Sequence, residues 1–232
     1  MNKFNFNIDV IDSQEVLSKS SYKSSTQLEK YEEIQVVDLG LPSKTLWCKY
    51  NIDVDPFKLK NAKDWYGNIY SWGELEPKEE YTWKNYKWCN GDRYSLTKYT
   101  FTPLYTKDSE PDHIEILELQ DDVAYLKTNG TKKIPTYENF EELKANTKHE
   151  FMFNYNDTHG LDGTLFTSKH NGNQIFFPTN QTYDEDYVHD GEYWSSSANL
   201  QDNAYKFQVG SWMCGLSSDI RCRGYMIRGV VI

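Results

Sequence analysis

Long hydrophobic runs are missing from this 232-residue sequence. The longest apolar stretches, such as residues 175–177 and 229–232, fall far short of the roughly 20 residues that a membrane-spanning helix needs. The opening residues, MNKFNFN, contain neither the apolar core of a signal peptide nor a cysteine for lipidation. We therefore expect no membrane insertion and no export, so that the protein stays where it is made.

Positive charge is also scarce. The chain has 25 lysine and arginine residues against 35 aspartate and glutamate residues, which gives a formal net charge of -10 and a pI near 5.0. Such a chain repels phosphate backbones, and no segment concentrates enough basic residues to reverse this locally. Nucleic acid is therefore excluded as an expected partner.

Cysteine is rare and irregularly placed. The four cysteines, Cys48, Cys89, Cys214 and Cys222, lack the close pairing of a metal site, and no partner histidines follow them. The sequence therefore predicts no metal and no cofactor. We interpret the cysteines as buried free thiols. A disulfide between Cys214 and Cys222 is the alternative, and it would fit an oxidising compartment.

Aromatic residues are abundant by contrast. Hydrophobic residues make up only 38 % of the chain, but 18 Tyr, 11 Phe and 7 Trp supply large areas for burial. The length suits one main domain with appendages. We therefore expect a single domain with an aromatic core.

The first 34 residues differ from the rest in composition and in the pattern of apolar residues. Apolar residues alternate with polar ones in the pattern of a strand with one apolar face: Phe4, Phe6, Ile8 and Val10. A serine- and lysine-rich stretch follows, which cannot bury enough surface to fold alone. We interpret residues 1–34 as an extended assembly arm and linker that adds its strand to a neighbouring subunit or larger particle. The alternative is an extra strand of the main domain.

After Ile34, short apolar runs are broken by Gly, Pro, Asn and Asp, which predicts many short strands. Residues 135–143 predict a helix with Thr136 as its cap and Phe140 and Leu143 on one face. A second helix is predicted over about 114–126, where Ile116, Leu119, Val123 and Leu126 recur at spacings of three and four.

The segments 163–168 and 174–178 predict a hairpin. Between them lies the sequence Asn171-Gly172, a pair typical of tight two-residue turns. We therefore expect the two strands to be joined by a tight Asn-Gly turn.

Several short motifs occur in the order in which one known family has them. They are VDLGLPSKTLW (37–47), YSWGE with PK (70–74, 77–78), YTWKNYKW (81–88), IPT (134–136), IFFP (175–178), GEYWSSS (191–197) and NAYKF (203–207). The chain resembles the FISUMP-type major paralogous domain, whose segments read DLGLPSGTLW, YFAWGE, RMPT, IFLP and YWSSS. Lys44 stands where that family has a glycine.

The resemblance implies an α+β, C-type-lectin-like fold over residues 35–232, with many short antiparallel strands and one or two helices, preceded by the extended arm. Such domains occur in surface proteins of gut bacteria and in virions of their phages, including crAss-like phages. Residues 89–112 are longer than the family pattern, so we expect this loop to carry a specific function.

Three short patterns resemble sites of known chemistry. Glu110-Pro111-Asp112 is similar to a sugar-binding EPN motif, but it lies before the helix and no WND follows. The acidic run 184–186 with Asp190 could hold a cation. Sulfatase-activating, formylglycine-generating enzymes share this broad fold class and use a reactive cysteine pair, but the spacing of Cys214 and Cys222 does not match. No catalytic residue is predicted.

The remaining expectation is that the protein binds a partner through its surface loops. Loops rich in Tyr, Asp and Trp give wide contact areas at low entropic cost. Our candidate binding residues are Tyr183, Asp184, Asp186, Tyr187, His189 and Trp212. The alternative for Tyr187 and Trp212 is that they close the core.

These observations favour a non-enzymatic virion surface protein, a head or tail fibre or decoration component. Its arm would contact other virion proteins, and its lectin-like domain a host-surface glycan or protein; we also expect a homo-oligomer. The expected location is the virion, assembled in the host cytoplasm. The alternatives are a bacterial cell-surface adhesin and, less favoured, a formylglycine-generating-type enzyme.

Overall fold

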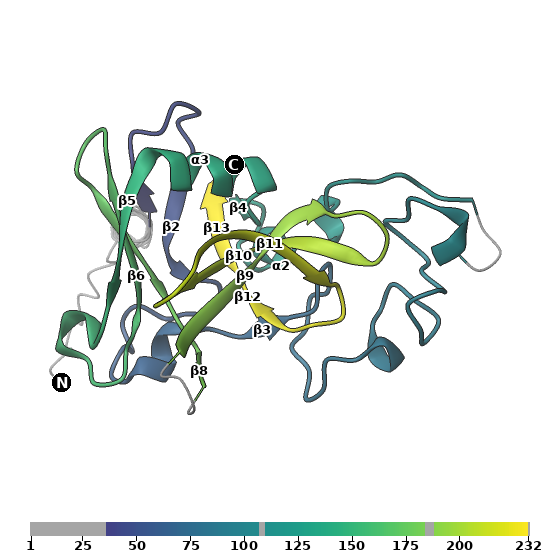
Figure 1. Ribbon diagram of the computed structural model, residues 1–232, viewed down its shortest axis with the longest axis horizontal. Helices are drawn as coiled ribbons and strands as arrows, with labels where there is room; N and C mark the ends of the chain where they lie inside the picture. The colour runs from purple at the N-terminus through teal and green to yellow at the C-terminus, as the bar shows by residue number, and fades with distance from the viewer. Residues whose placement is uncertain (1–35, 107–109, 184–187, 232) are drawn as a thin grey trace, which may run out of the picture. The chain divides into compact units, whose positions relative to one another are not determined.

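The computed structural model describes residues 36–106, 110–183 and 188–231, which belong to one structural unit beginning at Val36. Three sheets and two helices build this unit, so the predicted α+β class with many short antiparallel strands is confirmed (Figure 1). None of the helices in these ranges has the length and hydropathy that a bilayer crossing requires.

The largest sheet has the strand order β11-β10-β9-β12-β3, and β8 pairs with the beginning of β9. Its strands are β3 (Ile69–Tyr70), β8 (Gln181–Tyr183), β9 (Val188–Ala198), β10 (Asn203–Gly210), β11 (Cys214–Ile220) and β12 (Tyr225–Met226). All pairings are antiparallel except that of β12 with β9. The long strands β9 and β10 therefore form the backbone of the sheet.

Two smaller antiparallel sheets flank it. One has the order β1-β2-β13-β4, with β1 (Val36–Asp38), β2 (Leu46–Asn51), β13 (Arg228–Val231) and β4 (Lys132–Lys133). The other contains β5 (Thr147–Met152), β6 (Gly163–Ser168) and β7 (Gln174–Pro178). Both β1 and β13 pair with β2, so the two ends of the described chain lie in the same sheet.

The helix predicted from Thr136 is confirmed as α3 (Tyr137–Asn146). The Thr136 hydroxyl accepts a hydrogen bond from the Asn139 amide, as a cap should. The buried Phe140 stacks on Phe207 of β10, with 4.8 Å between ring centroids, and also contacts Trp47 of β2. Helix α3 therefore ties the large sheet to the β2 sheet.

The helix predicted over 114–126 is wrong for most of its length. Leu117 donates its amide to the Ser196 carbonyl, and Glu115 accepts from Ala198, so this segment runs beside β9 as extended chain. Only a 3-10 turn (Leu119–Asp121) and the short helix α2 (Val123–Lys127) follow. Pairing with β9 replaces the helix that the spacing of apolar residues predicts. Ile116, Leu119 and Leu126 form no buried helix face, because their side chains are exposed.

The predicted hairpin is confirmed as β6 and β7, but its tight turn is wrong. Pairing ends at Thr167 opposite Gln174, and the Ser168 amide donates to the Asn173 carbonyl. A five-residue loop over 169–173 joins the strands instead, and Gly172 alone of the Asn-Gly pair has a positive φ, 77°. A type I′ turn would need both residues in that conformation.

The motifs that carry the family resemblance build the core. Trp72 donates its indole NH to the Ser195 carbonyl, and Trp194 donates in return to the Tyr70 carbonyl, both at 2.8 Å. These two indoles are fully buried. Gly73 has φ 74°, and a Cβ there would lie 3.0 Å from side-chain atoms of Leu117 and Trp88. The segments 70–74 and 191–197 are thus locked to each other.

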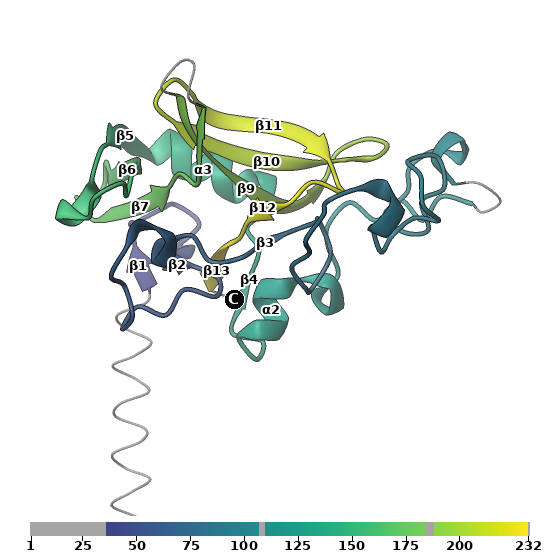
Figure 2. The same cartoon turned by 90° about the horizontal axis from the view of Figure 1, so that it is seen from below.

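Residues 75–106 and 110–113 form a lobe that contains no strand in its described residues (Figures 1 and 2). Figure 2 shows it at the right of the view, with β5, β6 and β7 at the left. It holds two 3-10 turns, Trp83–Asn85 and Pro103–Tyr105. A small core of Tyr86, Leu96, Tyr105 and Cys222 connects it to the end of β11.

Candidate functional site

The turn between β10 and β11, residues 211–213, exposes large apolar side chains. Trp212 is 81 % exposed, and Met213 beside it is also exposed. The two strands pair without interruption from Asn203 opposite Ile220 to Val209 opposite Cys214, so the turn sits on a rigid base. The alternative in which Trp212 closes the core is therefore wrong. We refer to residues 211–213 as the hairpin tip.

The other predicted binding segment reaches the same end of the sheet. Gly210, next to the hairpin tip, pairs with Asp190 of β9, and Asp190 pairs with Gln181 of β8. Tyr183 and His189 lie in β8 and β9 themselves, not in a free loop. The remaining predicted binding residues, Asp184, Asp186 and Tyr187, lie outside the described residues, as do the arm residues Phe4, Phe6, Ile8 and Val10.

At the opposite end of β9 and β10, the lobe presents a second surface. Three of its segments, which contact one another through Tyr105, each expose a large residue: Tyr94 (54 % exposed), Leu104 (69 %) and Leu200 (71 %). Leu200 comes from the β9–β10 turn, which the hydrogen bond from the Tyr105 hydroxyl to Gln201 joins to the lobe. The sequence flagged the long loop 89–112, but it offered no signal that Leu200 would join it.

Arg93 organises this second surface. Its guanidinium lies 2.9 Å from the carboxylate of buried Asp202, and it also lies over the rings of Tyr94 and Tyr105 at 5.5 and 5.9 Å. Cations above aromatic faces are attracted by the ring quadrupole. One half-exposed arginine therefore fixes two tyrosines against the β9–β10 turn.

Tyr99 fastens the base of the lobe. Its backbone has φ 60°, a left-handed conformation that costs free energy for a tyrosine. Four partners hold it. Arg221 donates to its carbonyl at 2.7 Å, and Asp112 accepts from its amide at 2.7 Å. Its hydroxyl donates to Asp121 at 2.6 Å and accepts from the Glu118 amide at 3.1 Å. Asp112 belongs to the EPD sequence, so its carboxylate has a structural role here.

Asp121 is the electrostatic centre of that base. Burial by itself would raise its pKa, but hydrogen bonds from Lys98 and Tyr99 and the charges of Lys98 and Lys87 outweigh burial and leave the pKa below its ordinary value. The pKa of Tyr99 is raised, mainly by burial and by the hydrogen bond to Asp121. The carboxylate thus stays ionised beneath the lobe.

A cleft of about 500 Å³ opens in the lobe. Two segments line it: Glu80, Thr82, Trp83 and Lys84 on one side and Gly91, Asp92, Arg93 and Tyr94 on the other. It combines two aromatic side chains with charged and hydroxyl groups, which is the usual make-up of a small-ligand site. Neither Trp83 nor Tyr94 was among the predicted binding residues, although Trp83 lies in the motif over 81–88 and Tyr94 in the long loop over 89–112.

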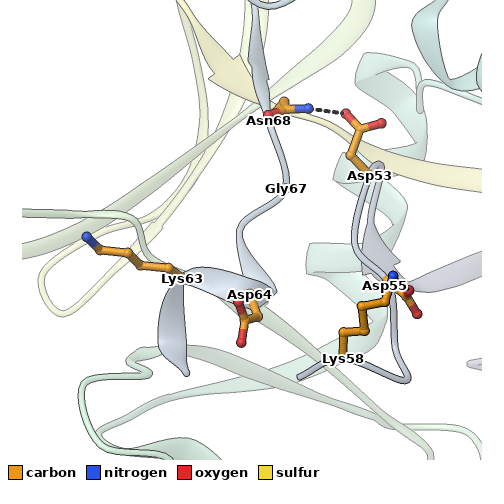
Figure 3. A pocket seen from close by; sticks show the side chains of 7 residues that line it. All are labelled: Asp53, Asp55, Lys58, Lys63, Asp64, Gly67 and Asn68. Atoms are coloured by element: carbon orange, nitrogen blue, oxygen red, sulfur yellow. Dashed lines mark hydrogen bonds and ion pairs between the residues drawn. The ribbon is translucent and has the colours of Figure 1, made fainter. Parts of the chain in front are cut away.

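A second pocket, of about 290 Å³, is lined by Asp53, Asp55, Lys58, Lys63, Asp64, Gly67 and Asn68 (Figure 3). Its three carboxylates already have structural partners. Asp53 accepts from Asn68 and Lys127, Asp55 pairs with Lys58, and Asp64 accepts two backbone amides of its own turn. This pocket therefore offers little chemistry that its own residues do not satisfy.

The cysteines are all free, as predicted, although only Cys48 and Cys222 are buried and the other two are half-buried. Cys214 begins β11 and Cys222 follows its end, so the strand, about 20 Å long, separates them. A disulfide needs Cα atoms within about 7 Å, so the Cys214–Cys222 alternative is wrong. Burial raises the pKa of both thiols to about 11, against the weaker effects of Lys144 and Arg223.

No group of three or more histidine, cysteine, aspartate or glutamate side chains in the described ranges is arranged to hold a metal ion. Comparisons with protein-family models, with curated proteins and with solved structures find no match for this chain.

Proposed function

We propose that this chain is a non-enzymatic recognition protein with a C-type-lectin-like scaffold, displayed on a virion, and that its surface loops bind the host surface or another protein. The observation that carries the proposal is the hairpin tip, where Trp212 is exposed on a rigid strand pair. Exposed tryptophan at the centre of a surface is a frequent source of binding energy. The lobe surface around Arg93 adds a second group of exposed aromatic and aliphatic side chains.

The interlocked motif segments support the lectin-like part of the proposal. Residues 70–74 and 191–197, which resemble the FISUMP-type signatures, bond to each other inside the core through Trp72 and Trp194. Leu39, from the first signature, is fully buried, and its carbonyl accepts from Ser168 of β6. A scaffold specified by such residues leaves its loops free to differ between members, which suits recognition.

The raised thiol pKa values support a role without cysteine catalysis. A nucleophilic thiol needs a depressed pKa, as at a helix start or beside an exposed cation. Burial acts in the opposite direction at both Cys214 and Cys222.

Binding is tested with the purified full chain and isolated envelopes of bacterial cells in which the virion propagates. We expect Trp212→Ala to lower co-sedimentation with the envelopes about tenfold or more, because tryptophan anchors contribute 2 kcal/mol and upward. Leu119→Ala is the matched control, since Leu119 is exposed outside both candidate surfaces. Equal binding by both variants would count against the hairpin tip as the contact surface.

Location is tested by mass spectrometry of purified particles. The virion proposal expects the chain among the structural proteins, and it expects a chain lacking residues 1–34 to be lost from the particles, because the predicted arm attaches it. Absence of the full chain from particles would reject the virion location and favour the bacterial adhesin. Capsid and tail genes beside this gene would favour the virion.

A further inference from the structure

We propose that the cleft between residues 80–84 and 91–94 binds an uncharged saccharide directly, without a metal ion. The inference rests on the proposed function in one respect, since it names the ligand class of one recognition surface. The cleft measures about 500 Å³, a size usual for small-ligand sites, and all the residues that line it belong to the lobe.

Both walls of the cleft are held in place before any ligand arrives. On one wall, the Asn85 side chain donates to the Glu80 carbonyl at 2.8 Å and accepts from the Thr82 amide at 3.2 Å. On the other, the Asp92 carboxylate accepts from the Tyr94 amide at 2.8 Å, and Arg93 pairs with Asp202. A site ordered in advance loses less conformational entropy on binding.

The side chains offer what a sugar ring needs. Trp83 and Tyr94 supply aromatic surface for the apolar C–H face of a pyranose ring. The lining also includes two acceptors, the Glu80 and Asp92 carboxylates, one donor, the Lys84 ammonium group, and the Thr82 hydroxyl, which donates to the Asn85 side chain and still has lone pairs to accept. Hydroxyl groups both donate and accept, so a mixed set of this kind matches a sugar better than it matches a purely apolar ligand.

Charge narrows the class of saccharide. Arg93 is neutralised by buried Asp202, so the other charged side chains that line the cleft are two carboxylates, Glu80 and Asp92, and one ammonium group, Lys84. The whole chain carries a formal charge of -10. A phosphate, sulfate or sialic acid would be repelled, whereas an uncharged hexose or N-acetylhexosamine would not.

The experiment measures binding of the full chain to immobilised uncharged oligosaccharides of hexoses and N-acetylhexosamines, with sialylated and sulfated counterparts beside them. We expect uncharged members to bind, the anionic members to bind less, and EDTA to change nothing. Tyr94→Ala should weaken binding about tenfold, and Tyr94→Phe, which keeps the ring, should retain most of it. Glu80→Gln should weaken binding severalfold with no change in folding, because Glu80 is exposed.

Phe153→Ala is the matched control, because it removes an exposed aromatic residue that belongs neither to the lobe nor to the hairpin tip. The inference is overturned if no uncharged saccharide binds, if anionic ones bind equally well, or if Trp212→Ala abolishes saccharide binding while Tyr94→Ala leaves it intact. Envelope binding that depends on Trp212 without any saccharide binding would overturn this inference and leave the proposed function standing. Saccharide binding that depends on Tyr94, together with absence of the chain from purified particles, would support this inference and reject the virion location in the proposed function.

Discussion

The two ends of the sheet formed by β9, β10 and β11 expose large side chains in different ways. At the hairpin tip, strand pairing up to Val209 and Cys214 is the support for Trp212. The described residues of the lobe contain no strand, and the ion pair of half-exposed Arg93 with buried Asp202 takes the place of strand pairing next to Tyr94. A short turn is held rigid by the two strands that it joins. A long loop needs a small core of its own and side chains that bond it to the rest of the domain, which we call anchors.

Arg221 is the clearest of those anchors. Its fully buried guanidinium donates to the carbonyls of Tyr99, Asn203 and Asn199 and lies 4.9 Å from the ring of Trp72. One side chain therefore joins the lobe, the β9–β10 turn and the main core.

The largest expected effect follows from removing that anchor. Arg221→Met should lower the free energy of unfolding by about 3–5 kcal/mol, because one buried and two partly buried carbonyls lose a charged donor. Urea denaturation of the full chain measures this. Arg223→Met is the control, since Arg223 is exposed and its loss should cost less than about 0.5 kcal/mol. Equal costs for the two variants would contradict an anchor specific to the lobe.

Thiol reactivity compares the two ends directly, because Cys214 lies beside the hairpin tip and Cys222 in the lobe core. With the pKa of each raised to about 11, the thiolate fraction at neutral pH should be about a hundredfold below that of free cysteine. We expect alkylation to be slowed at least that much, and Cys222 to react more slowly than half-buried Cys214. A rate equal to that of free cysteine at either thiol would contradict its raised pKa, and only a rate above that of free cysteine would reopen the enzyme hypothesis.

Asp121→Asn should have a smaller effect that depends on pH. Loss of the charged acceptor for Lys98 and Tyr99 should cost about 2 kcal/mol at pH 7. The folded-state pKa of Asp121 lies below its ordinary value of 3.8, so its contribution is complete above about pH 4 and disappears as the pH falls further. The stability difference between the variant and the parent chain should therefore shrink in acid.

Denaturation series at pH 7, 5 and 3 measure that dependence. Asp55→Asn is the control, because Asp55 pairs with Lys58 on the surface. A difference between parent and Asp121→Asn that stays constant down to pH 3 would contradict the assigned ion pairs.

The same comparison explains what could be predicted from the sequence. Helix α3 was predictable because its cap and its apolar face, Thr136, Phe140 and Leu143, are local signals. The β6–β7 hairpin was predictable from its apolar runs, although not its loop length. Exposure of Trp212 could be proposed only as one of two alternatives, because a tryptophan in a loop fits either the core or the surface.

The lobe could be predicted only in outline. Its length marked it as unusual, but its anchors are contacts over long sequence separations, such as Arg93 with Asp202 and Tyr99 with Arg221. The helix predicted over 114–126 was wrong for the same reason, because a local pattern of apolar residues does not reveal that Leu117 pairs with β9. Trp83 and Tyr94 line the proposed cleft together, although they come from different segments of the lobe and no local pattern pairs them.

The smallest expected effects separate the two ends most cleanly. Trp212→Ala should change the free energy of unfolding by less than about 0.5 kcal/mol, because the exposed ring contributes little to the core. Tyr94→Ala should cost about 1 kcal/mol, since its ring packs 5.4 Å from that of Tyr105 and beneath Arg93. Urea denaturation of both variants in parallel measures the difference. If Trp212→Ala proved the more destabilising, the hairpin tip would be part of the packed structure, and its exposed tryptophan could no longer be assigned to recognition.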